Sequence, residues 1–243
     1  NSYPEEDKEY LYNETKNMYV KNYVEPNGVD FATYLQTYGM TEEDFKKEIK
    51  CLFEDPDCDY YSITKKGFKK YYDAYLEAKE EGDKLDFDVF FGIEHWYAKG
   101  KEILIYGITL EFLLAHPELN TARIEMYAEL VHEYGGILVH AHPHRIRDYI
   151  DPNFMPRYDV CDGIEVYNAG DVDEINELAL QDAVRLNKIM TSGGDVHKVI
   201  DEPKLGRAGV GFSRRLKNIH DFVTALKNGE GQIMFHGEMR KIQ

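Results

Sequence analysis

The stretch GGILVHAHPHR, residues 135–145, combines a glycine pair, a short apolar run and three histidines. Glycines end helices and branched apolar residues favour strands, so this stretch predicts a helix that stops at the glycines and a strand over 137–140. If the strand continued, its alternation would aim His140, His142 and His144 at one spot. Imidazole is a common metal ligand and general base. Two interpretations stay open here: a site that uses the histidines, or a polar strand end that exposes them.

Outward from this stretch, from about Leu85, short apolar segments alternate with amphipathic ones. The expected strands are 89–94, 102–108, 137–140, 163–167, 189–192 and 232–235, and the expected helices are 121–134, 173–186 and 218–227. This succession predicts βαβ units and therefore an α/β fold with a parallel sheet or barrel. In such folds the ligand site lies where the carboxyl ends of the strands meet.

The first 84 residues have a different character, rich in Lys, Glu and Tyr and poor in branched apolar residues. Thr41 followed by three acidic residues indicates a helix start, and the apolar spacing over 65–80 indicates a second helix that Gly82 ends. We expect 1–84 to be a helical segment or insertion packed on an α/β portion over 85–243, within one structural domain.

Composition and charge narrow the class of protein. The 243 residues are 43% hydrophobic and 30% charged with a net charge of −16, which argues against general nucleic-acid binding because a polyanion would be repelled. No apolar run is long enough to cross a bilayer, and the acidic start does not resemble a signal peptide. Cys51, Cys58 and Cys161 form no CxxC or zinc-finger spacing. We therefore expect a cytoplasmic protein with reduced thiols and no membrane partner, and make no prediction of its oligomeric state.

Four side chains capable of holding a metal follow three of the expected strands. Glu94 ends VFFGIE, His142 follows GGILVHAH, and Asp195 and His197 follow IMTSGGDVH. If these strands are parallel neighbours, their ends deliver the four groups to one rim. Carboxylates mixed with imidazoles suit Mn, Fe or Zn.

With these residues in view, the sequence resembles the PHP (polymerase and histidinol phosphatase) family of metal-dependent phosphoesterases. The resemblance rests on four stretches in order: FFGIEHW (90–96), GGILVHAHPHR (135–145), DGIEVYN (162–168) and TSGGDVH (191–197). It covers roughly residues 86 to 235.

The resemblance implies a distorted (β/α)7 PHP-type barrel, with the helical amino-terminal segment as an addition. It also implies two or three divalent metal ions, Zn, Mn or Fe, at the barrel mouth. Carried over by position, Glu94 would bridge two metals, His142 would bind one of that pair, Asp195 the other and His197 a third.

The chain departs from the family pattern in two places. The family opens with a His-x-His strand, whereas the first histidine here is His95 and no His-x-His occurs before residue 140. Either the numbered chain begins downstream of those strands, which we expect, or the protein has lost them. Glu102 stands where the family often has a ligating histidine, so it is a further candidate metal ligand or a surface residue at a strand start.

The function implied is hydrolysis of a small phosphorylated metabolite by metal-activated hydroxide, with no further catalytic side chain predicted. His144, Arg145 and Lys198 are candidates to bind the substrate phosphate, each with a solvated loop as the alternative reading. Two rival functions stay open. One is a degenerate PHP module that binds without turnover, and the other is a metal-dependent amidohydrolase.

Overall fold

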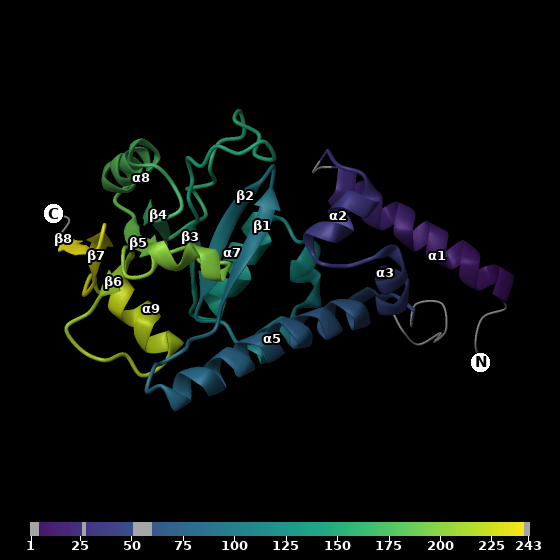
Figure 1. Cartoon of the computed structure of the whole chain (residues 1–243), viewed down its shortest axis with the longest axis horizontal. Helices are drawn as coiled ribbons and strands as arrows, with labels where there is room; N and C mark the ends of the chain where they lie inside the picture. Colours follow the sequence, from purple (N-terminus) through teal and green to yellow (C-terminus); the bar gives the residue numbers. More distant parts are fainter. Residues whose placement is uncertain (1–4, 26–27, 51–59, 241–243) are drawn as a thin grey trace. The chain divides into compact units, whose positions relative to one another are not determined.

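The computed structural model describes residues 5–25, 28–50 and 60–240 (Figure 1). The chain divides into two compact units. One unit comprises Asn1–Ala74 and Leu113–Thr121, and the other comprises Tyr75–Phe112 and Ala122–Gln243. The domain boundary expected near residue 84 stays a prediction.

The regular structure of the first unit, in its described residues, is helical. Its elements are α1 (Glu5–Tyr19), a π-helical turn (Val20–Val24), α2 (Phe31–Thr37), α3 (Glu42–Glu48), the first part of α5 (Tyr60–Lys84), the end of α6 (Leu110–Ala115) and a 3-10 turn (Pro117–Thr121). The helix start expected at Thr41 is confirmed, because Thr41 and Asp44 form a reciprocal capping box at the start of α3. Gly82 does not end the second expected helix, since α5 continues to Lys84.

The second unit contains a five-stranded sheet in the order β1-β2-β3-β4-β5. The strands are β1 (Gly92–Ala98), β2 (Lys101–Tyr106), β3 (Ile137–His140), β4 (Gly163–Asn168) and β5 (Ile189–Gly193). A second, antiparallel sheet consists of β6 (Gly209–Gly211), β7 (Gln232–Phe235) and β8 (Glu238–Arg240). Ser192 of β5 links the two sheets, because its hydroxyl donates to the carbonyl of Met234 and accepts from the N–H of Gly209.

The prediction of a parallel sheet is half right. β3, β4 and β5 are parallel, whereas β1–β2 and β2–β3 pair antiparallel. Only Lys99 and Gly100 separate β1 from β2, both with positive φ, which is the backbone of a tight hairpin and is too short for a parallel crossover. The five-stranded sheet also has two edges, β1 and β5, so the described residues form an open mixed α/β sheet and not a closed ring of seven strands.

The two faces of this sheet carry different side chains. The pairing Leu104↔Val139 places both residues on one face, and Ile103↔His140 places those two on the other. Helix α9 (Ile219–Lys227) packs on the Val139 face through Val223.

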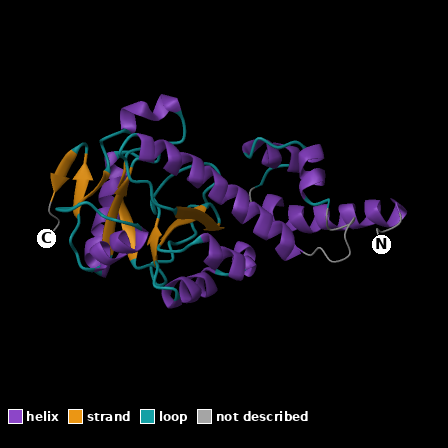
Figure 2. Ribbon diagram, turned by 90° about the horizontal axis from the view of Figure 1, so that it is seen from below, coloured by secondary structure: helices purple, strands orange, loops and turns teal. Residues whose placement is uncertain are grey.

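The opposite face is covered by two helices. Helix α8 (Asp173–Leu186) packs against Ile164, the β4 residue that lies beside His140. Helix α7 (Ile124–Glu133) brings Tyr127 against the ring of His95. Figure 2 shows the strands of this unit lying among helices.

Tight packing explains the glycine pair after α7. A Cβ at Gly136 would lie 2.6 Å from the carbonyl oxygen of Tyr106, so only glycine lets the chain enter β3 this close to β2. The predicted helix stop and strand start at this point are confirmed.

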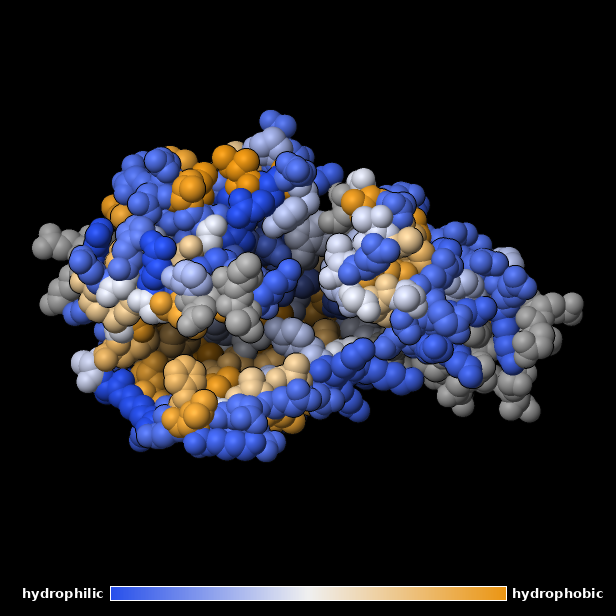
Figure 3. Space-filling view, viewed as in Figure 1, coloured by the Kyte–Doolittle hydropathy of each residue, from blue (hydrophilic) through white to orange (hydrophobic). Residues whose placement is uncertain are grey.

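The surface of the second unit is not uniformly polar. Figure 3 shows apolar side chains gathered over α9 and the carboxyl-terminal end of α5. Leu85 and Phe87, which follow α5, are both largely exposed. Among the described residues, no helix is both long enough and apolar enough to cross a membrane.

Candidate metal centre

The β1–β2 hairpin brings two carboxylates to the same face of the sheet. Glu94 of β1 pairs with Leu104 of β2, and Glu102 lies two residues before Leu104. Because side chains alternate along a strand, Glu94 and Glu102 share the face that also carries Val139. Glu94 was expected at a strand end but lies in the middle of β1, so the hairpin and not a parallel strand end delivers it.

His142 reaches these carboxylates because the chain leaves strand geometry after β3. His142 has a φ of 25°, in the left-handed region that side chains other than glycine seldom adopt. Its Nε2 lies 3.1 Å from Glu94 Oε1 and 3.3 Å from Glu102 Oε2. One ligand atom from each of the three residues lies within 4.8 Å of the others, a spacing that allows a metal ion to be held between them. Glu102, the further candidate ligand from the sequence, thus belongs to the cluster.

Glu165 of β4 fixes the turn that carries His142. Its carboxylate is buried and accepts hydrogen bonds from the His142 N–H at 3.0 Å and from Asn168 Nδ2 at 3.1 Å. Gly193 of β5 makes room for this group, since a Cβ there would lie 2.4 Å from Glu165 Oε1. The supporting residues therefore come from β4, the parallel neighbour of β3, and from β5, the next strand in the sheet.

The electrostatic properties of the cluster arise because several carboxylates lie close together in a partly buried environment. Burial, with the charge of Glu94 added, raises the pKa of Glu102. Burial also raises the pKa of Glu165. Burial opposes a charge on His142, but the hydrogen bond to Glu94 and the nearby carboxylates outweigh it, so the pKa of His142 is raised. The cluster thus attracts positive charge.

Asp195 is held by an arginine. Arg145 Nη2 lies 2.5 Å from Asp195 Oδ2, and Arg145 Nε donates to both carboxylate oxygens of Asp171. Although burial opposes it, this cation lowers the pKa of Asp195. Asp195, like His142, has a positive φ, and strained backbone of this kind gathers at functional sites.

The other predicted site residues lie elsewhere. The side chain of His197 is 67% exposed and contacts Asp195, with its Nδ1 3.2 Å from Asp195 Oδ1. Lys198 is exposed on the loop after β5. His144 pairs with Asp182 of α8 at 2.8 Å. The three-residue cluster includes neither Asp195 nor His197.

The alternating histidines do not share a face, which corrects the expectation drawn from a continued strand. His140, on the α7 and α8 face, meets the hydroxyl of Tyr97 at 2.9 Å, and burial lowers its pKa to about 3. His142 meets the two glutamates, and His144 meets Asp182. The strand ends at His140, so the alternation ends there too.

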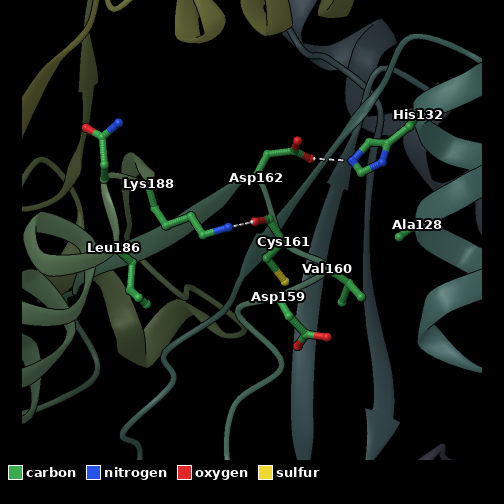
Figure 4. A pocket seen from close by; sticks show the side chains of 9 residues that line it. Ala128, His132, Asp159, Val160, Cys161, Asp162, Leu186 and Lys188 are labelled. Atoms are coloured by element: carbon green, nitrogen blue, oxygen red, sulfur yellow. Dashed lines mark hydrogen bonds and ion pairs between the residues drawn. The ribbon is translucent and has the colours of Figure 1, made fainter.

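A cavity of about 510 Å³ lies at the other end of the strands, away from the cluster of Glu94, Glu102 and His142 (Figure 4). Asp162 and Lys188, which line it, immediately precede β4 and β5, so it faces the amino ends of these strands. Three of its polar side chains have partners, because His132 bonds to Asp162 at 2.8 Å and Lys188 donates to the Cys161 carbonyl. It is therefore separate from the acidic cluster and carries no predicted site residue.

Comparison with known proteins gives little to add to this geometry. No protein-family model matches the chain, and no curated protein sequence matches it. Among solved structures, it is similar to a Bifidobacterium adolescentis protein described as a proposed metal-dependent phosphoesterase, with 14% identity and a TM-score of 0.40. That match covers 63% of this chain and 81% of the other. The functional argument therefore rests on the site itself.

Sequence reasoning missed two residues of this region. Neither Glu165 nor Asp171 was among the candidate site residues. A carboxylate in the middle of IEV was the available signal for Glu165, because a buried acid needs polar partners. Nothing in the sequence pointed to Asp171, which depends on the fold to meet Arg145.

Proposed function

We propose that this protein is a metal-dependent phosphoesterase that hydrolyses a small phosphorylated metabolite. The observation that carries this proposal is the convergence of Glu94, Glu102 and His142 within 4.8 Å. Two carboxylates and one imidazole are a donor set that suits Mn²⁺, Fe²⁺ or Zn²⁺. A divalent cation held there would act as a Lewis acid on a phosphoryl oxygen and on water.

The chain's own residues would prepare this site in two ways. Glu165 anchors the backbone of His142 and so holds the turn from which the imidazole reaches Glu94 and Glu102. The excess of carboxylates, on a chain of net charge −16, repels an anionic substrate unless a cation neutralises the site. Such a site disfavours long polyanions and favours a small phosphate ester.

The proposal also includes three residues that would bind the substrate phosphate. Lys198 is exposed on the loop that follows β5, near in sequence to Asp195, and remains free to move toward an incoming phosphate. Arg145 and His144 are engaged with carboxylates, so binding a phosphate would require them to exchange partners. For the fold, the proposal is a distorted barrel of the (β/α)7 type that stays open in the described residues, with the five-stranded sheet and the β6–β8 sheet joined at Ser192 as its arc.

A binding module without turnover is the second candidate, and one observation favours it. Asp195, the family's aspartate position, is paired with Arg145 and stands outside the cluster. A site with fewer ligands can keep a cation and yet lack the power to activate water. A metal-dependent amidohydrolase would use the same ligands and differs only in its substrate.

The test is hydrolysis of p-nitrophenyl phosphate by the full chain with Mn²⁺, Fe²⁺ or Zn²⁺. Glu102→Gln and His142→Ala should each lower kcat/KM by about 100-fold or more, because losing a ligand removes several kcal/mol of charge stabilisation. Glu129→Gln on the exposed side of α7 and His132→Ala at the remote cavity are matched controls that should leave the rate unchanged. Bound metal without hydrolysis of phosphate esters or amides would favour the binding module, and a folded protein that binds no metal would overturn both.

A further inference from the structure

The guanidinium of Arg145 fills a space between two carboxylates beside the cluster. It donates from Nε to Asp171 Oδ1 at 3.0 Å and Oδ2 at 3.1 Å, and its Nη2 lies 2.5 Å from Asp195 Oδ2. The side chains of Arg145, Asp171 and Asp195 are only 8%, 3% and 12% exposed, so water screens these contacts poorly. The three groups form a buried ion triad.

This triad and the cluster are parts of one loop system. The N–H of Arg145 donates to the carbonyl of His142 at 3.0 Å, so one tight turn after β3 carries both the imidazole and the guanidinium. Asp195 is joined to the same turn by its ion pair with the Arg145 guanidinium. A fixed positive charge therefore stands where a second group of carboxylates would otherwise attract a cation.

We propose that Arg145 takes the place of a second metal ion, so that the site holds one divalent cation, between Glu94, Glu102 and His142. This inference rests on the proposed function, since it sets the number of cations at the same site. A cation bound by Asp195 would have to displace a buried guanidinium from its carboxylates, and an unpaired buried charge is strongly unfavourable. The imidazole of His197 is mostly exposed and lies against the carboxylate and the backbone carbonyl of Asp195, and it then has no cation to bind.

The proposed site then contains two kinds of positive charge, an exchangeable metal cation and the permanent charge of the Arg145 guanidinium. The exchangeable cation sits on the hairpin carboxylates, while the guanidinium stays charged beside Asp195 and Asp171. Burial opposes this charge, but the hydrogen bonds and charges of the two carboxylates outweigh it and raise the pKa of Arg145 above its usual range. Asp195 then positions Arg145 and is not a metal ligand.

The test is the stoichiometry and affinity of Mn²⁺ binding to the full chain, by equilibrium dialysis with elemental analysis and by calorimetry. The wild-type protein should bind one equivalent. Asp195→Asn should change the affinity of that cation by less than about tenfold, whereas Glu102→Gln should weaken it by more than about tenfold. Arg145→Met, which removes the buried guanidinium shared by Asp171 and Asp195, should gain a second equivalent, and Arg145→Lys should stay at one.

Each contrary result has a separate meaning. Two equivalents in the wild-type protein would overturn this inference and leave the proposed phosphoesterase function standing. A loss of more than about tenfold in Asp195→Asn, or a folded Arg145→Met protein that still binds one equivalent, would also overturn it. If Arg145→Met does not fold, as judged by circular dichroism, the wild-type stoichiometry and the Asp195→Asn affinity decide the question. No bound Mn²⁺ in the wild-type protein would overturn the inference together with the proposed function.

Discussion

The backbone N–H of His142 donates a 3.0 Å hydrogen bond to the buried carboxylate of Glu165, so a residue of β4 holds the turn that presents the imidazole. We expect Glu165→Ala to weaken Mn²⁺ binding by about 10- to 100-fold, because the turn loses its anchor and two buried donors lose their acceptor. Glu165→Gln keeps an acceptor oxygen and should retain most of the affinity. Calorimetric titration measures both, and unchanged binding in Glu165→Ala would remove Glu165 from the site.

A methyl group at position 193 should disturb the same anchor from the other side. The added Cβ of Gly193→Ala would lie 2.4 Å from Glu165 Oε1, so the carboxylate has to move. We expect weaker Mn²⁺ binding in Gly193→Ala, but no further loss when Gly193→Ala is added to Glu165→Ala, because the clashing carboxylate is then gone. Gly67→Ala, at an open position of α5, is the control. If the losses of Mn²⁺ affinity in Gly193→Ala and Glu165→Ala simply add in the double variant, the Gly193 change does not act through the Glu165 carboxylate.

Cation binding should stabilise the unit that contains the cluster. A ligand that binds only the folded state at about 100 times its dissociation constant adds about 2.7 kcal/mol, which corresponds to a rise of about 5–10 °C in Tm for a unit of this size. Thermal unfolding with Mn²⁺ should show this rise, and EDTA should reverse it. His142→Ala should show no rise, whereas His132→Ala should behave as wild type.

Cys161 should be chemically inert in the folded protein. It lies 2% exposed beside β4, and burial raises the pKa of its thiol to about 12. Since the thiolate is the reactive form, iodoacetamide at mildly alkaline pH should leave the Cys161 peptide unmodified until urea unfolds the chain. Peptide mass spectrometry separates it from Cys51 and Cys58, which lie outside the described residues. Rapid alkylation of Cys161 in native buffer would show that the β4 region opens.

The sequence was a good guide where a pattern is local. The glycine pair before β3, the amphipathic stripe of α7 and the capping box at Thr41 each follow from a few neighbouring residues, and the structure has all three. The three members of the cluster were also among the candidate ligands. Glu94 and His142 stand out because they end or follow apolar runs, whereas Glu102 was a candidate only through the family resemblance.

The rest depended on geometry that no short pattern encodes. The segment around Lys99 reads as an ordinary break between strands, yet its two left-handed residues form the hairpin that reverses β2 and makes the sheet mixed. Likewise, the turn at His142 ends the alternation on which three converging histidines depended. The Arg145 triad joins residues from three separate loops, so only the folded chain brings them together.

The hairpin origin of Glu94 and Glu102 has a consequence for how the centre is assembled. The two acids are neighbours as soon as this ribbon forms, whereas the imidazole joins them only once β2 has docked along β3. A bound cation would therefore stabilise the pairing of β2 with β3. A change that weakens this strand pairing should release the cation while Glu94 and Glu102 stay side by side on the hairpin.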